Sequence, residues 1–130
     1  MKSPSAAYSI RLSLAFLWIY QGLVPKLLFI NADEIAVWQW FGLSYSYAVL
    51  AGQAAGIAEI LFGLCFLVSK ERYLHTLNII TLIGLFFLIA ILIPDTLIRA
   101  FNPVAMNLSM LMLSVVYLKL PTHAKLDLSA

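Results

Sequence analysis

Four long apolar segments, separated by short polar stretches, run through this chain of 130 residues, at about residues 6–24, 47–68, 73–93 and 103–120. A helix rises about 1.5 Å per residue, so segments of this length reach roughly 27–33 Å. The hydrocarbon core of a bilayer is about 30 Å thick. The pattern therefore predicts an all-α integral membrane protein, a four-helix bundle with antiparallel up-down spans that forms a single domain over residues 1–130.

The connection between the first two apolar segments has a different pattern, from Leu27 to Ser46. Asp33 is suited to cap a helix N-terminus, and Gly42 is suited to stop one. The same stretch holds aromatic side chains of the kind that settle at headgroup depth, namely Trp38, Trp40 and Tyr45. We predict a short interfacial helix here. Pro25 lacks the amide proton that a continuing helix needs, so the first span should end or kink there.

One acidic residue, Glu59, lies near the middle of the second span. Helical periodicity places it on one face with three glycines, Gly52, Gly56 and Gly63. Small residues at such spacing let another helix come close. The first span repeats the spacing with Arg11, Ala15, Trp18 and Gly22. We expect these two faces to meet, with Glu59 near the bilayer midplane and pointing at protein instead of lipid.

The composition agrees with a membrane protein. Hydrophobic residues make up 63% and charged residues 11% of the chain, with a mean hydropathy of +0.97, so polar side chains are too few to coat a soluble domain. A net charge of +2 on scattered basic residues does not favour nucleic-acid binding. The single cysteine, Cys65, has no partner spacing, so neither a thiol redox pair nor a metal or haem motif is supported.

The distribution of Lys and Arg predicts the orientation in the membrane. Lys26 and Arg99 lie on one side of the predicted bundle. Six basic residues lie on the other side, namely Lys2, Arg11, Lys70, Arg72, Lys119 and Lys125. Because cytoplasmic loops carry the excess of basic residues, both termini are predicted to be cytoplasmic.

Depth along the helices sorts the remaining polar residues into two levels. Arg11 and Asn78 lie about one and a half turns inside the cytoplasmic boundary, within reach of Glu59. An outer level contains Gln21, Gln53 and Asn107, with Lys26 and Asp95 at its rim. His75, beside the polar turn after the second span, is interpreted as an interfacial histidine.

Glu59 has a structural and a functional interpretation. Paired with Arg11, it could serve only to fix helix register. In a functional role it is either a neutral acid that carries protons or an ionised counter-ion held by Arg11. Arg11 could instead extend toward the cytoplasmic headgroups. The amide side chains of Asn78, Gln53, Gln21 and Asn107 are typical interhelical hydrogen-bonders.

Three stretches together resemble the DoxX-like family of small four-helix membrane proteins: WIYQGLVPKLL at residues 18–28, EILFGLCFLV at 59–68 and FNPVAMNLSMLML at 101–113. The family-like positions are Trp18, Gly22, Pro25, Lys26, Glu59, Gly63, Asn102, Pro103 and Asn107. The resemblance implies a bacterial inner-membrane protein. The name-giving relatives form the membrane subunit of a thiosulfate:quinone oxidoreductase, and similar domains occur joined to dehydrogenase-like proteins. Met106 stands where relatives often have a basic residue, so no anion site is implied there.

Our leading hypothesis is a bundle that holds a small amphipathic ligand, such as a quinone cofactor, in a pocket edged by Glu59, Gln53, Trp18 and Asn107. In an oxidoreductase version, Lys26 attracts an anionic substrate, the acid handles protons, and a partner redox subunit carries the electrons. One alternative is a module that binds or transports a lipid-like molecule. Another is a structural helper without a ligand. A homo-oligomer is compatible with each of them.

Overall fold

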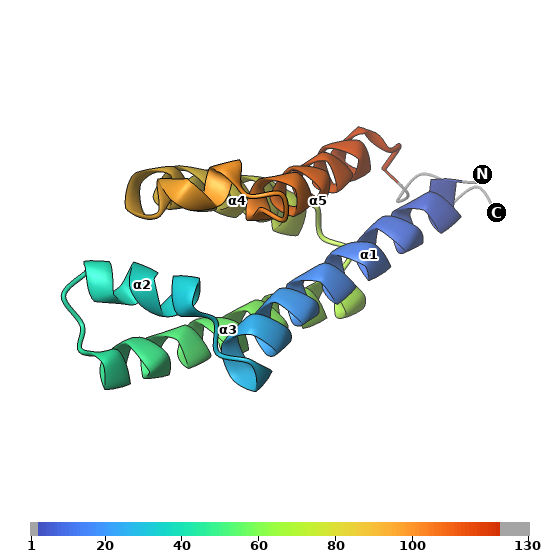
Figure 1. Cartoon of the computed structure of the whole chain (residues 1–130). Helices are drawn as coiled ribbons and strands as arrows, with labels where there is room; N and C mark the ends of the chain where they lie inside the picture. The colour runs from blue at the N-terminus through green and yellow to red at the C-terminus, as the bar shows by residue number, and fades with distance from the viewer. Residues whose placement is uncertain (1–2, 123–130) are drawn as a thin grey trace.

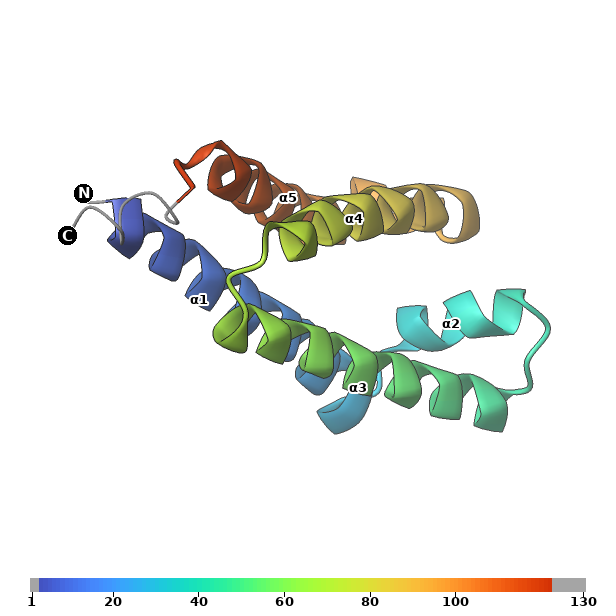
Figure 2. The same cartoon turned by 180° about the vertical axis from the view of Figure 1, so that it is seen from behind.

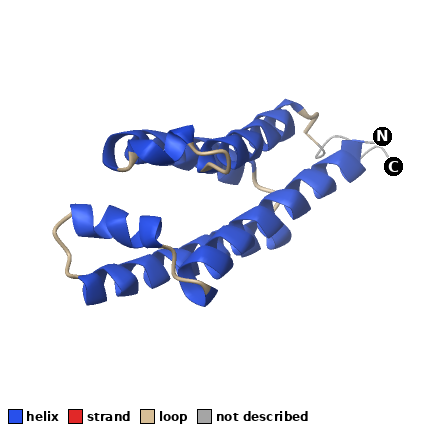
Figure 3. Cartoon of the chain, in the orientation of Figure 1, coloured by secondary structure: helices blue, strands red, loops and turns tan. Residues whose placement is uncertain are grey.

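The computed structural model describes residues 3–122, which are helical with short turns between the helices and contain no strand (Figure 3). The elements in order are α1 (Ser3–Leu23), a π-helical turn η1 (Val24–Leu28), α2 (Ala32–Trp40), α3 (Tyr45–Val68), α4 (Arg72–Leu92), a 3-10 helix η2 (Pro94–Ile98) and α5 (Pro103–Lys119). The all-α prediction is confirmed, and the four long helices lie at the four predicted spans. Lys2 and Lys125, which contribute to the predicted orientation, lie outside the described residues.

The helices form two layers. One layer contains α1, α2 and α3, with α1 running antiparallel to α3 and α2 lying beside the first half of α3 (Figure 1). The other layer is the hairpin of α4 and α5, which the view from behind shows stacked over the first layer (Figure 2). The start of α1 and the end of α5 lie at the same end of the molecule (Figure 1). This arrangement leaves α2 and η2 together at the opposite end.

Two helices, α3 and α4, are long and apolar enough to cross a membrane. The segment formed by α1 and η1 is bent by 86° relative to α2. If this bent pair counts as one span, the protein has a third crossing. Helix α5 is apolar but shorter, with 17 residues. Only 22% of the most apolar window of α3, and the same share of α4, is buried inside the molecule. Most of their apolar surface therefore faces outward, as lipid contact requires.

Helix α2 corresponds to the helix predicted between the first two spans. Its N-cap is Asn31, not Asp33, because the Asn31 side chain accepts a hydrogen bond from the Asp33 amide at 2.8 Å. The helix stops before Gly42, whose φ of +90° is readily adopted only by glycine. The chain then reverses into α3, so that α2 lies along α3 (Figure 1).

Glycines let α1 and α3 pack with their backbones in contact. A Cβ atom added to Gly56 would lie 2.6 Å from the carbonyl oxygen of Gly22, and one added to Gly63 would lie 2.9 Å from that of Ala15. These separations are shorter than any ordinary contact, so no side chain fits at either position. The predicted meeting of the two small-residue faces is confirmed.

We expect Gly56→Ala to lower the free energy of unfolding by about 1–3 kcal/mol, since the new methyl group overpacks the contact of α1 with α3. Gly84→Ala on α4 is the matched control, because its Cβ would have no neighbour within 4 Å. Reversible unfolding by sodium dodecyl sulfate in mixed micelles measures both. Equal stabilities of the two variants would contradict the close approach seen at Gly56.

Candidate functional site

The turn after α1 brings Lys26 back against α3. Pro25 cannot donate an amide hydrogen bond, and the chain widens into the π-helical turn, in which the Phe29 amide donates to the Val24 carbonyl oxygen at 2.8 Å. The predicted break at Pro25 is therefore a widened turn that continues to Leu28. A Cβ atom on Gly56 would lie only 2.9 Å from the Cβ of Lys26. Lys26 thus leaves the rim position that straight-helix arithmetic assigned to it.

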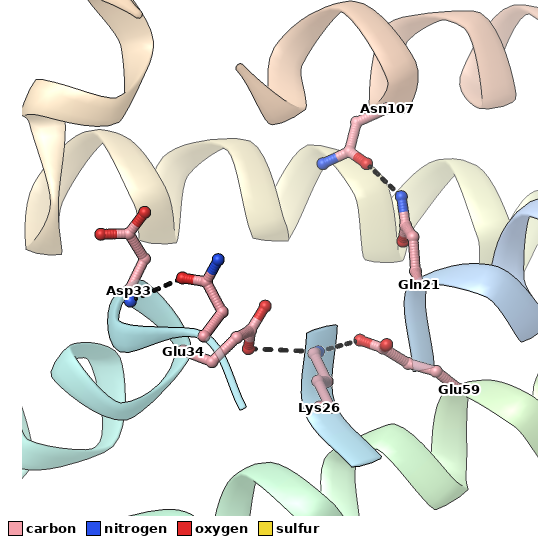
Figure 4. A network of polar contacts seen from close by, with 7 residues as sticks. Gln21, Lys26, Asp33, Glu34, Glu59 and Asn107 are labelled. Carbon is pink, nitrogen blue, oxygen red and sulfur yellow. Dashed lines mark hydrogen bonds and ion pairs between the residues drawn. The ribbon is translucent and has the colours of Figure 1, made fainter. Parts of the chain in front are cut away.

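The Lys26 ammonium group lies between two carboxylates (Figure 4). Its Nζ atom is 2.5 Å from Glu59 Oε1 and 3.4 Å from Glu34 Oε2. The side chains of Lys26 and Glu59 are 11% and 15% exposed, whereas that of Glu34 is 32% exposed. Charge interactions are stronger away from water, so the pair of Lys26 and Glu59 is the tighter one. Within residues 3–122, Glu59 Oε2 is the single buried side-chain polar atom without a hydrogen-bond partner.

Two further polar contacts join the helical layers near this cluster. The Gln21 amide nitrogen donates to Asn107 Oδ1 at 3.2 Å (Figure 4). The same nitrogen lies 3.6 Å from the sulfur of Met110. Farther out, Arg99 Nη1 is 2.5 Å from Asp33 Oδ2, and both side chains are substantially exposed. These contacts connect the layer of α1, α2 and α3 to the α4–α5 hairpin.

A cavity of about 490 Å³ opens between the two layers beside this cluster. Its volume is in the range of small-molecule sites, roughly 300–1,000 Å³. Its polar lining residues are Gln21, Lys26, Asn31, Asp33, Glu34, Glu59, Thr96, Arg99 and Asn107. Its apolar lining residues include Trp38 and Phe41 beside them and Leu85, Leu88 and Ile89 from α4. The cavity is thus amphipathic, with charged and apolar side chains in one lining.

A second, almost entirely apolar cavity of about 260 Å³ lies between α4 and α5. Asn107 and Ile89 line both cavities. The two spaces therefore share a wall at these residues, so an apolar cavity lies directly beside the amphipathic one.

The structure brings together three of the six predicted ligand residues, Glu59, Lys26 and Asn107, at the larger cavity. Gln53 lies on α3 but is not among the residues that line this space. Trp18 is 1% exposed and donates from Nε1 to Asn78 Oδ1 at 2.8 Å, away from the cavity. Trp18 and Gln53 therefore do not line the larger cavity, which is bounded by α1, η1, α2, α3 and the α4–α5 hairpin.

The predicted pairing of Arg11 with Glu59 is wrong. Arg11 Nε donates to the carbonyl oxygen of Phe66 at 2.9 Å, and Nη2 donates to that of Leu67 at 2.7 Å. These oxygens belong to the last turn of α3, where carbonyl groups lack intrahelical partners. Arg11 therefore caps the C-terminus of α3 instead of neutralising its acid, and it is 8% exposed instead of extending toward headgroups.

A second polar cluster lies deep between α1, α4 and α5. Asn78 accepts from Trp18 and donates through Nδ2 to Ser114 Oγ at 2.8 Å. His75 Nδ1 is 3.1 Å from the same hydroxyl, and its ring stacks on Tyr117 with 3.6 Å between centroids. His75 is 1% exposed, so it packs inside the bundle, and its predicted depth at the membrane interface stays a prediction. Two polar levels exist as predicted, but Glu59 belongs to the level of Lys26 and not to that of Asn78.

The sequence argument missed Glu34, Asp33 and Arg99 as parts of the site. Asp33 was assigned only a capping role, Arg99 only a place on one side of the bundle, and Glu34 no role. One signal was available in the sequence. On the side of the predicted bundle that carries only two basic residues, Lys26 and Arg99, two adjacent acidic residues also occur, Asp33 and Glu34. Opposite charges that share one end of a bundle are expected to pair.

Fold and site together define a class, an all-helical protein with membrane-capable helices that encloses a buried acid–base cluster beside an amphipathic cavity. A family model described as the DoxX-like family matches residues 15–115, which covers most of the chain. The chain belongs to the DoxX-like family. No curated protein and no solved structure matches it.

Proposed function

We propose that this DoxX-like protein binds a small amphipathic molecule within a bacterial inner membrane, as a four-span protein with both termini in the cytoplasm. The observation that carries the proposal is the 490 Å³ cavity, which is lined by the Lys26–Glu59 pair and by apolar side chains from α2 and α4. A buried carboxylate oxygen without a partner costs free energy, and a ligand that donates a hydrogen bond to it recovers that cost.

The two neighbouring cavities suit a ligand that has a polar head and an apolar tail. A polar head would occupy the space beside Lys26 and Glu59, and an alkyl or isoprenoid tail would pass Asn107 and Ile89 into the apolar cavity between α4 and α5. Apolar surface removed from water or from headgroups stabilises such a complex in proportion to its area. A purely structural role would need neither space.

A quinone-linked membrane subunit is the more specific version of this proposal. What supports it is Asn107, whose amide nitrogen is turned away from Gln21 and can donate to a quinone carbonyl oxygen (Figure 4). This version requires a partner subunit that carries electrons. The ammonium group of Lys26 already contacts two carboxylates, so the geometry does not favour it as a receptor for an anionic substrate.

Filling the cavity tests the proposal. We expect Ala55→Phe, on the α3 face that lines the cavity, to weaken saturable binding of a decyl-substituted benzoquinone by at least about tenfold, because the ring occupies ligand space. The neighbouring Ala54 is exposed, so Ala54→Phe is the matched control and should bind as the native protein does. Binding is measured by equilibrium titration in nanodiscs, with empty nanodiscs as the partition blank. Identical binding by both variants would refute the assignment of the cavity.

A further inference from the structure

The charges around the larger cavity are unbalanced. Its charged lining residues are two cations and three carboxylates: Lys26, Arg99, Asp33, Glu34 and Glu59. The Arg99–Asp33 pair is self-contained, with 2.5 Å between its charged atoms. The remaining three share one positive and two negative charges, so the cavity wall has a formal excess of one negative charge.

The contacts of Lys26 leave carboxylate oxygens available. Its Nζ atom contacts Oε1 of Glu59 and Oε2 of Glu34. Among the contacts within residues 3–122, the second oxygen of Glu59 has no partner, and the ion pair of Glu34 with Lys26 uses one of its two oxygens. An ionised carboxylate can only accept hydrogen bonds, so the buried oxygen of Glu59 requires a donor, the free oxygen of Glu34 can accept one, and a negative head group would be repelled.

Aromatic rings face the same space. Trp38 and Phe41 line the cavity, with 6.4 Å between their ring centroids. Trp38 lies one helical turn after Glu34 on α2, so the ring and the carboxylate share one face of the helix. A carboxylate and an indole ring that line one cavity are a combination that attracts an organic ammonium ion, by charge and by the ring quadrupole.

We propose that the ligand of this cavity is a cationic amphiphile, an alkylamine-like molecule whose ammonium head lies between Glu34, Glu59 and Trp38. This inference rests on the proposed function, a cavity for a small amphipathic molecule, and narrows its ligand class to a cation in place of a quinone, which has no donor for the free oxygen of Glu59. The ammonium donates to the free carboxylate oxygens, and its hydrocarbon chain enters the apolar cavity past Asn107. If Glu34 is neutralised, the formal excess of one negative charge in the cavity lining disappears. Glu34 is therefore the residue that selects a positively charged head group.

The test compares three ten-carbon probes that differ only in the head: decylamine, 1-decanol and decanoate. Attraction across about 6 Å at an effective dielectric constant near 20 corresponds to roughly a hundredfold in affinity, and dehydration of the cation removes part of it. We therefore expect decylamine to bind about tenfold more tightly than decanol, and decanoate most weakly, in phosphatidylcholine nanodiscs at neutral pH. Empty nanodiscs again supply the partition blank.

Two variants complete the design. Glu34→Gln should lower the ratio of decylamine to decanol affinity by about tenfold relative to the native protein. Comparing this ratio between proteins in the same nanodiscs cancels how each probe partitions into lipid. Asp95→Asn is the matched control, because Asp95 is exposed within η2 and outside the cavity lining, and the ratio of this variant should equal that of the native protein. Equal binding of all heads, a preference for decanoate, or an unchanged ratio in Glu34→Gln overturns the cationic ligand but leaves the proposed function standing. Absence of saturable binding by any probe, together with an undisturbed quinone titration in Ala55→Phe, overturns both.

Discussion

Replacing Lys26 by methionine is expected to lower the free energy of unfolding by about 3–5 kcal/mol, the range found when one partner of a buried ion pair is removed. The methionine keeps the hydrocarbon stem that packs against Gly56 but deletes the charge. Glu59, whose side chain is 15% exposed, then has no counter-ion and only a more exposed acid, Glu34, beside it. Unfolding by sodium dodecyl sulfate in mixed micelles measures the loss.

The double variant Lys26→Met with Glu59→Gln separates lost charge pairing from lost packing. Because no ionised group is then left unpaired at the centre of the site, it should recover most of the stability lost by Lys26→Met alone. Lys119→Met serves as the control, since Lys119 is exposed at the end of α5 and its charge is solvated. If the double variant is as unstable as the sum of its single changes, Lys26 and Glu59 are not coupled.

The fold could be predicted from the sequence where a single helix determines the pattern. The long apolar runs located the four long helices, and the spacing of Gly56 and Gly63 identified the face that meets α1. Both depend on 3.6-residue periodicity, which needs no knowledge of other helices. The number of membrane crossings is a different question, because the bend of 86° between α1 with η1 and α2 sets whether they act as one span.

The partners of the polar residues were predicted less well, because pairing depends on small departures from ideal helices. The π-helical turn at Pro25 moves Lys26 inward onto Glu59. A depth calculated from a uniform rise per residue cannot predict this displacement, because it assumes an ideal α-helix. Arg11 was assigned to Glu59 by similar depth, yet the end of α3 offered unpaired carbonyl groups at closer range. Charge type alone did not distinguish a carboxylate from a helix C-terminus, since both attract a guanidinium group.

The deeper polar cluster gives the second large effect. Asn78→Leu is expected to lower the free energy of unfolding by about 2–3 kcal/mol, because it leaves the indole N–H of Trp18 buried without an acceptor. A hydrogen bond between membrane helices is usually worth only about 0.6 kcal/mol, but that average applies where the freed group finds another partner. Trp18 is 1% exposed and Asn78 is completely buried, so water cannot replace the lost acceptor. The deletion of Asn78 contacts to Ser114 and to the Met110 carbonyl adds to the loss.

Two comparisons make this prediction specific. Gln53→Leu removes an amide of similar chemistry that is outside this cluster, and it should change stability by less than about 0.5 kcal/mol. Combining Asn78→Leu with Trp18→Phe removes donor and acceptor together, so the double variant should lose less than the sum of its parts. Since the Asn78 cluster does not line the cavity, Asn78→Leu should leave decylamine affinity unchanged, whereas Glu34→Gln should change affinity with little effect on stability. Loss of binding in Asn78→Leu at a temperature where the protein remains folded would show that the two polar levels act as one site.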